Sequence, residues 1–281
     1  MRKLARRALA GLSWVNLAVI SGIVSSLCFP ASTRADRLSE IRAAGTITVA
    51  TEMHYAPFDM LVDGQYQGLC KDLFDEVAKD LGVSVRYVDL PWPSILPGLD
   101  AGKFDFVNAP VTITPERAKR YAFTLPIGDA TVSLLKQAGN EAIKTPNDIV
   151  GLTVGAQKGS AELTQLKALG TSLGGVRIRE YVNIDEALAD LGTGRIQAVA
   201  NALPLQAYAA RQRPDRFEMV LPSFGKPGHF AWLGRRDADS ESLIEAVNTA
   251  LMRMHEDGRL DAINTRWLGT APRLPRVMPQ P

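Results

Sequence analysis

Short apolar runs alternate with amphipathic segments along most of the chain. Runs rich in β-branched and aromatic residues predict strands, and apolar positions spaced three and four apart predict helices. In the first half this gives strands at 45–51, 83–90 and 104–110, with helices at 70–82 and 94–102. The same rhythm restarts after residues 130–137, so the chain contains two similar units.

The second unit repeats the order of strand and helix. It predicts strands at 152–157, 176–182 and 196–202, with helices at 160–170 and 184–194. A strand at 229–235 and a helix at 241–258 follow, and the proline-rich tail 270–281 is expected to be loose. Alternating strands and helices favour a mostly parallel sheet covered on both faces. We therefore predict an α/β fold of two lobes, each with a central sheet flanked by helices, and a cleft between them.

The first 35 residues have the composition of a secretory signal peptide. A basic start is followed by an apolar stretch at 17–29 and by small residues that end at Ala35. This pattern predicts cleavage after Ala35 and export. A retained membrane anchor and lipidation at Cys28 are the alternatives, and the pair Arg6-Arg7 leaves open which export route is used.

Removing that segment changes the charge balance. Residues 1–35 carry five basic residues and no acidic one, so the formal net charge falls from +2 to −3. No broad basic footprint for nucleic acid remains. The mature chain keeps one cysteine, Cys70, and therefore has no internal disulfide. No metal-ligand spacing is present, and we expect no cofactor and no metal.

The segment DFVNAPVTITPERAKRYAF at 105–123 contains an unusual helix start. Thr114 fits the N-cap and Pro115 the first helical position, where a missing N–H costs nothing. Arg117 then brings a cation to the helix end that already carries partial positive charge. Either Arg117 points to solvent beside Glu116, or it faces an anion that satisfies both the guanidinium and the helix end.

The segment GAQKGSAEL at 155–163 contains a second helix start. Gly159 permits a tight turn, Ser160 can cap the helix, and the N–H groups near Ala161 and Glu162 point out of the turn. The segment is too short for a phosphate-binding P-loop, so it forms either a backbone cradle for a small carboxylate or an ordinary capped helix. If it faces Arg117, one carboxylate can bind both features.

The order of motifs over residues 40–269 resembles a known family. Tyr-Ala-Pro-Phe at 55–58, Gly-Lys-Phe-Asp at 102–105, Ile-Thr-Pro-Glu-Arg at 113–117, Gln-Lys-Gly-Ser at 157–160 and Gly-Arg-Ile at 194–196 occur in sequence. This order resembles the periplasmic solute-binding proteins of polar amino-acid ABC transporters, bacterial extracellular solute-binding protein family 3.

The resemblance implies a type II periplasmic-binding-protein fold with two crossing strands between the lobes. Lobe 1 would comprise 36–133 plus 229–281, and lobe 2 would comprise 134–228. The lobes would close by a hinge on a small, amino-acid-like carboxylate. The implied partner is the membrane permease of an ABC importer, and the protein is expected to be a monomer.

The resemblance also implies roles for individual residues. Arg117 would bind the ligand's α-carboxylate with help from Thr112, while Ser160 and the Ala161 N–H would meet it from the other lobe. The remaining implied ligand contacts are Tyr55 and Trp92 as an aromatic wall, the Pro110 carbonyl toward an ammonium, and Glu52 near the ligand's side chain. Tyr55 and Trp92 could instead be core aromatics and Glu52 a surface carboxylate, and Phe58 is expected in the core.

Three departures from the family pattern affect the expected ligand. Ala202 stands where the family usually has the Asp that takes the α-ammonium, Gln197 replaces another Asp, and Cys70 replaces an Asp or Asn. Losing a charge-assisted hydrogen bond costs about 1.5–3 kcal/mol. Asn201 or Glu162 could compensate, so a ligand carboxylate is expected more firmly than a free α-amine.

Two other functions are compatible with the same scaffold. Cyclohexadienyl dehydratases, which act on prephenate or arogenate, carry a glutamate in a similar loop, where this chain has Glu162 as a possible general acid. A ligand-sensing module for a membrane receptor would use the same cleft with a different partner. His54, His229 and His255 do not form a Ser/His/Asp arrangement. Turnover of prephenate would distinguish the enzyme from a binding protein.

Overall fold

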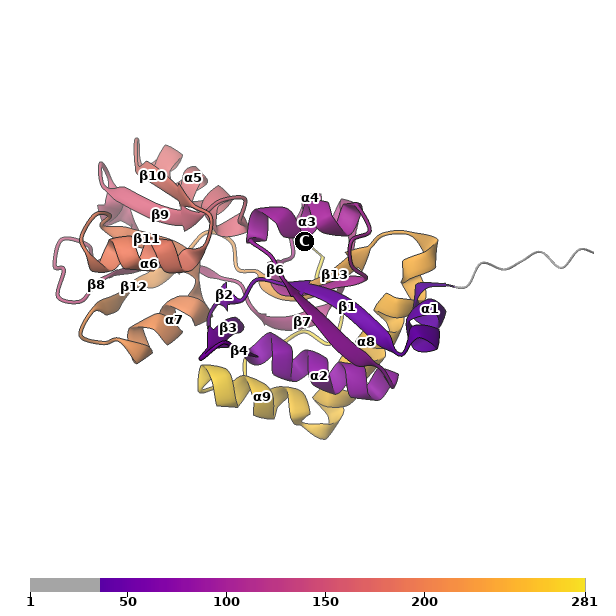
Figure 1. Cartoon of the computed structure of the whole chain (residues 1–281). Helices are drawn as coiled ribbons and strands as arrows, with labels where there is room; N and C mark the ends of the chain where they lie inside the picture. Colours follow the sequence, from indigo (N-terminus) through magenta and orange to yellow (C-terminus); the bar gives the residue numbers. More distant parts are fainter. Residues whose placement is uncertain (1–35, 281) are drawn as a thin grey trace, which may run out of the picture. The chain divides into compact units, whose positions relative to one another are not determined.

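The computed structural model of the chain describes residues 36–280. The predicted signal peptide, residues 1–35, lies outside the described residues. Within residues 36–280, no helix combines the length and apolar character needed to cross a membrane. The described part contains two five-stranded sheets and a small three-stranded one (Figure 1).

The first five-stranded sheet has the order β5-β1-β6-β13-β7. Its strands are β5 (Ser84–Asp89), β1 (Thr46–Thr51), β6 (Phe106–Thr112), β13 (His229–Arg235) and β7 (Tyr121–Asp129). β5, β1 and β6 run parallel, whereas β13 is antiparallel to both β6 and β7. Four of its five strands therefore run in the same direction, in agreement with the predicted mostly parallel sheet, and β13, which returns from the other sheet without a covering crossover helix, is the reversed strand.

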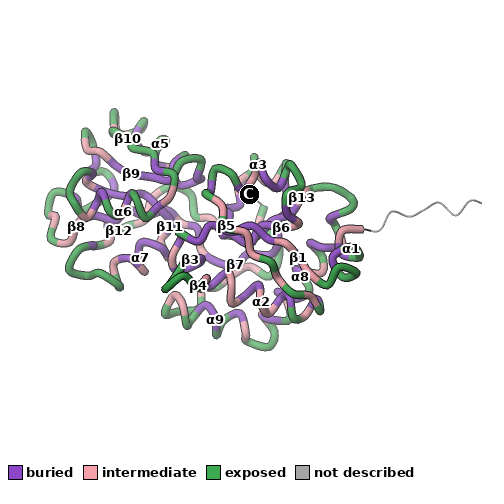
Figure 2. The backbone as a smooth tube through the Cα atoms, viewed as in Figure 1, coloured by how far each residue is buried: buried purple, intermediate pink, exposed green. Residues whose placement is uncertain are grey.

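Helices cover both faces of this sheet. α2 (Leu69–Leu81) and α8 (Ala238–Asp257) pack on one face, and α3 (Trp92–Asp100) packs on the other. The alternation of side chains along β13 explains this division: Phe230 and Trp232 join the cluster with α2 and α8, while Ala231 and Leu233 join the cluster with α3. β6 and β13 are buried along most of their length, and Figure 2 shows the centre of this sheet in purple.

The second sheet repeats the design in the order β10-β9-β11-β8-β12. Its strands are β10 (Arg177–Tyr181), β9 (Thr153–Gln157), β11 (Ala198–Ala202), β8 (Val132–Gln137) and β12 (Phe217–Phe224). β10, β9 and β11 are parallel, and β8 is antiparallel to β11 and β12. α5 (Ala161–Ser172) packs on one face, and α6 (Ile184–Gly192) and α7 (Leu203–Gln212) pack on the other.

The fold thus has two lobes, each with a mixed sheet between helices. The chain passes from the first sheet to the second between Asp129 and Val132, and it returns between Phe224 and His229. The remaining elements are α1 (Arg37–Ala44), β2 (His54–Tyr55), β3 (Asp59–Val62), β4 (Gln65–Gln67), α4 (Pro115–Arg120), the 3-10 turn η1 (Pro146–Ile149) and α9 (Arg259–Leu268). Residues 270–280 contain no helix or strand, in agreement with the predicted loose tail.

Candidate ligand-binding site between the lobes

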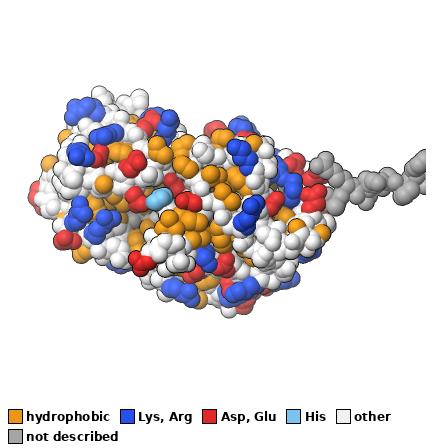
Figure 3. Space-filling model, in the orientation of Figure 1, with side chains coloured by type: hydrophobic (Ala, Val, Ile, Leu, Met, Phe, Trp, Pro, Cys, Tyr) orange, Lys and Arg blue, Asp and Glu red, His pale blue; other side chains and the backbone are white. Residues whose placement is uncertain are grey.

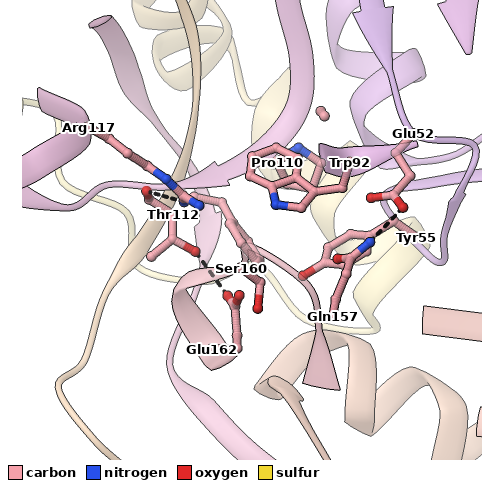
Figure 4. A pocket seen from close by; sticks show the side chains of 11 residues that line it. Glu52, Tyr55, Trp92, Pro110, Thr112, Arg117, Gln157, Ser160 and Glu162 are labelled. Carbon is pink, nitrogen blue, oxygen red and sulfur yellow. Dashed lines mark hydrogen bonds between the residues drawn. The ribbon is translucent and has the colours of Figure 1, made fainter. Parts of the chain in front are cut away.

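The carboxyl ends of parallel strands from both sheets meet at one pocket. Glu52 follows β1, Thr112 ends β6, and Gln157 ends β9. Ligand sites in α/β proteins lie outside the carboxyl ends of parallel strands, because the following loops converge there. The pocket encloses about 290 Å³, including the part open to solvent. Its lining residues are Glu52, Tyr55, Trp92, Ala109, Pro110, Thr112, Arg117, Gln157, Ser160, Glu162 and Phe230 (Figure 4).

Arg117 connects the two lobes at this pocket. The Thr114 side chain accepts a hydrogen bond from the Arg117 N–H at 3.3 Å, so the predicted N-cap of α4 is confirmed. The guanidinium donates to the Thr112 carbonyl at 3.1 Å and to the Gly159 carbonyl of the other lobe at 3.2 Å. It therefore faces the turn before α5 rather than solvent.

The surroundings of Arg117 favour an anionic ligand. Its guanidinium carbon lies 5.1 Å from the centre of the Trp92 ring, which allows a cation–π interaction. Burial lowers the pKa of Arg117, while the nearby Glu162 carboxylate opposes that shift. Its hydrogen bonds to Thr112 and Gly159 both go to neutral carbonyls, so a carboxylate would supply the stronger, charge-assisted partner.

The start of α5 forms the opposite wall of the pocket. Gly159 has φ +75°, a backbone conformation that residues other than glycine rarely adopt. The Ser160 hydroxyl accepts a hydrogen bond from the Leu163 N–H at 2.9 Å, which confirms the predicted cap. Glu162 is buried at 3% exposure and accepts a hydrogen bond of 3.0 Å from the Thr112 hydroxyl.

Glu52 is buried rather than on the surface. Gln157 of the second lobe donates a hydrogen bond of 2.6 Å to its Oε1 atom. Burial raises the pKa of Glu52 to about 8, although the hydrogen bonds from Gln157 and the Trp92 backbone partly offset the effect. Around neutral pH the Glu52 carboxyl is therefore largely protonated.

The aromatic residues divide between pocket and core. Tyr55 and Trp92 are both buried and both line the pocket, whereas Phe58 lies fully in the core, as predicted. The Tyr55 hydroxyl donates to Asn201 Oδ1 at 2.8 Å. Burial, together with the Glu162 and Glu52 carboxylates, raises the pKa of Tyr55, so its hydroxyl stays protonated.

Two residues with predicted ligand contacts lie outside the pocket lining. Ala161 is the first residue of α5 and is buried, and Asn201 lies behind Tyr55 near the end of β11. Three lining residues were not predicted: Ala109, Phe230 and Gln157. Gln157 belongs to the Gln-Lys-Gly-Ser motif, and its position at a strand end before a glycine turn was the available signal.

The three departures from the family pattern have structural explanations of different kinds. Ala202 ends β11 and brings no polar side chain, and its N–H donates to Asn201 Oδ1. Gln197 accepts a hydrogen bond of 3.0 Å from the Thr153 N–H, so it ties the start of β9 to the segment before β11. Cys70 is the second residue of α2 and is fully buried in the core.

The pocket thus combines a guanidinium, two carboxyl groups, an aromatic wall and several hydroxyl and carbonyl groups. Such an arrangement can hold one small polar molecule that carries a carboxylate. Among residues 36–280, no three His, Cys, Asp or Glu side chains are grouped so as to hold a metal ion.

Comparison with known proteins agrees with this geometry. The sequence model of the bacterial extracellular solute-binding proteins, family 3, matches residues 47–270. The L-cystine-binding protein TcyJ of Escherichia coli (strain K12) is 29% identical over 268 residues, which cover 95% of this chain and 96% of that protein.

Solved structures show the same likeness. An ancestral arginine-binding protein bound to arginine superposes with a TM-score of 0.74 at 32% identity, covering 80% of this chain and 99% of that one. The ancestral amino acid-binding protein AncCDT-1, described as a precursor of cyclohexadienyl dehydratase, has a TM-score of 0.76 at 32% identity and covers 82% of this chain and 99% of its own. The similarity therefore extends over both lobes and the pocket between them.

Proposed function

Because the chain belongs to the bacterial extracellular solute-binding proteins, family 3, we propose that it captures an amino acid for an ABC importer. The ligand binds in the pocket between the lobes through its α-carboxylate. Names of relatives support this class of ligand, since they include proteins that bind cystine and arginine.

One observation carries the proposal: the Arg117 guanidinium lies between the end of β6 and the turn before α5. Its partners are the carbonyls of Thr112 and Gly159, one from each lobe. A carboxylate at this point would gain a bidentate partner from one lobe, and the Ser160 hydroxyl and the N-terminal amides of α5 from the other. Tyr55, Trp92 and Pro110 would enclose the rest of the molecule.

The proposal includes hinge closure. We propose that lobe 1 comprises 36–133 plus 229–281 and that lobe 2 comprises 134–228. The two sheets divide the chain in nearly the same way, since only Val132 and Ser133 of β8 lie on the lobe 1 side of this boundary. Within residues 36–280 two chain segments link the sheets, so a rotation about them opens the pocket. Closure on the ligand brings Arg117 and the start of α5 to the same carboxylate.

We also propose export and a membrane partner. The signal peptide at 1–35 directs the chain to the periplasm, where the mature protein acts as a monomer and delivers its ligand to a permease. On the face in Figure 3, basic and acidic side chains are interspersed. This suits a protein that meets small solutes and one docking partner.

Ligand screening tests the proposal. Thermal unfolding of the purified mature protein is measured with each of the twenty protein amino acids and with L-cystine. At least one should raise the midpoint, because a ligand that binds only the folded state stabilises it. Arg117→Ala should abolish that shift, while Lys119→Ala, an exposed change on the same helix, should keep it. No shift with any amino acid would contradict the proposal.

A dehydratase is the second candidate, and one observation favours it: Glu162 is a buried carboxylate in the pocket. We propose that this chain is a binding protein without turnover, since the relatives named above are binding proteins. Incubation with prephenate and detection of phenylpyruvate by absorbance decide the matter. Steady product formation that is lost in Glu162→Gln would establish the enzyme instead.

A further inference from the structure

Glu162 is the anionic counterpart of Arg117 in the pocket. The two side chains line the same pocket, yet no ion pair within 4.0 Å joins them among the described residues. Glu162 accepts one hydrogen bond, from the Thr112 hydroxyl to Oε1, and Figure 4 shows its carboxylate directed into the pocket. One cation and one anion are thus held apart around a shared space.

Thr112 sets the spacing between these charges. Its carbonyl accepts from Arg117 at 3.1 Å, and its hydroxyl donates to Glu162 at 3.0 Å. Both charged groups are therefore held by atoms of one residue. In an α-amino acid, the ammonium nitrogen and the carboxylate carbon are separated by two bonds, or roughly 2.5 Å. A zwitterion of that size suits a pocket in which the Arg117 guanidinium and the Glu162 carboxylate are both held by Thr112.

The neighbouring polar groups are less suited to receive an ammonium. Asn201 Oδ1 already accepts from the Tyr55 hydroxyl at 2.8 Å and from the Ala202 N–H at 2.7 Å. Its amide nitrogen is buried without a partner, so this side chain has a donor to offer rather than an acceptor. Glu52 is engaged by Gln157 across the pocket, beyond Trp92 in Figure 4.

We infer that Glu162 binds the ligand's α-ammonium, so that the pocket selects zwitterionic α-amino acids over acids that lack the amine. The inference rests on the proposed function and sharpens it, because it specifies which side chain pairs with each charge of the ligand. Arg117 of the first lobe takes the carboxylate, and Glu162 of the second takes the ammonium. Binding then requires both lobes, and an amine-free acid satisfies only one of the two charges.

The test compares amino acids with their deaminated analogues by isothermal titration calorimetry. The pairs are L-arginine with 5-guanidinovalerate, L-histidine with imidazole-4-propionate, and L-cystine with 3,3′-dithiodipropionate. For the pair whose amino acid binds, the wild type should bind the deaminated analogue about ten- to 100-fold more weakly, the loss expected for one charge-assisted hydrogen bond. Glu162→Gln should lower the affinity for the amino acid by a similar factor and leave the affinity for the analogue unchanged.

Several outcomes would overturn the inference. Equal affinity of the wild type for both members of a pair does so without any variant, even if Glu162→Gln fails to fold. Equal weakening of both members by Glu162→Gln would mean that Glu162 contacts another part of the ligand. The matched control is Glu245→Gln on the exposed side of α8, which should change neither affinity. A wild type that binds no amino acid would instead overturn the proposed function.

Discussion

Gln157, at the end of β9, donates a hydrogen bond of 2.6 Å to Glu52, which follows β1 in the other lobe. The contact joins the two sheets at the pocket. Glu52 is the acceptor in this contact and one of two carboxyl groups lining the pocket. Because burial raises its pKa from 4.5 to about 8, the contact is formed with a largely neutral carboxyl near pH 7.

This shift predicts a pH-dependent stability. The folded-state pKa of Glu52 lies above its unfolded value. The stability that the neutral Glu52 carboxyl contributes to the fold is therefore full below about pH 4.5 and is lost as pH rises toward 8. Glu52→Gln cannot titrate. The free energy of unfolding of the Glu52→Gln variant, relative to that of wild type, should therefore rise by up to about 1.4 kcal/mol per pH unit between pH 5.5 and 7.5. Urea denaturation at several pH values measures this difference.

The control for Glu52 is the solvent-exposed Glu245. Glu245→Gln should give a difference from wild type that does not change over the same pH range. If the Glu52→Gln difference were equally flat, the carboxyl would be titrating near its ordinary pKa, and the neutral contact with Gln157 would have to be abandoned.

A second buried carboxyl, Asp59, predicts a role for Tyr66. The Tyr66 hydroxyl donates to Asp59 and accepts from the Asn108 amide at 3.3 Å. Burial raises the pKa of Asp59 to about 7, and the hydrogen bond from Tyr66 lowers it. Tyr66→Phe removes that donor, so it should destabilise the protein by about 1–3 kcal/mol at pH 8.

The destabilisation caused by Tyr66→Phe should increase with pH. The folded pKa of Asp59 is raised above 3.8, so its stabilising contribution is lost as pH rises through 7. Without Tyr66 the folded pKa rises further and the loss continues to higher pH. Tyr66→Phe should therefore cost less at pH 6 than at pH 8. Tyr208→Phe, on the half-buried face of α7, is the comparison and should show no such trend.

The cap of α5 predicts a stability effect that does not depend on ligand. Ser160 accepts from the Leu163 N–H at 2.9 Å, and Ser or Thr caps contribute about 1 kcal/mol. Ser160→Ala should lower the free energy of unfolding by that amount, whereas Ser160→Thr should retain most of it. Ser172→Ala at the exposed end of the same helix should have little effect. A neutral Ser160→Ala would show that the cap does not stabilise α5.

Local features of this protein could be read from its sequence. The caps at Thr114 and Ser160, the strand at 229–235 and the core position of Phe58 depend on neighbouring residues or on a simple pattern, and all four are confirmed. The helix predicted at 241–258 begins earlier, at Ala238, because Asp237 caps it. The short strands β2 to β4 have too few residues to show a period.

Features that depend on distant pairing could not be read in this way. The sequence leaves Glu52 either near the ligand's side chain or on the surface, because its partner Gln157 lies 105 residues away in the chain. The sequence offers Asn201 as one replacement for the missing carboxylate, but its oxygen accepts a hydrogen bond from Tyr55, 146 residues distant. The antiparallel course of β13 also follows from the return of the chain between lobes, which no local period encodes.

Trp92 offers an optical test of the pocket. Its ring lines the pocket and lies 5.1 Å from the Arg117 guanidinium, whereas Trp232 is fully buried in the core and Trp267 donates to Asp72 on the outer helices. A ligand carboxylate that pairs with Arg117 changes the charge beside the Trp92 ring. Addition of a stabilising amino acid should therefore change the tryptophan emission of the wild type and of Trp267→Phe. Trp92→Phe should lose that change while keeping its fold. A full response in Trp92→Phe would place the bound molecule away from Arg117, because no other tryptophan among residues 36–280 lines the pocket.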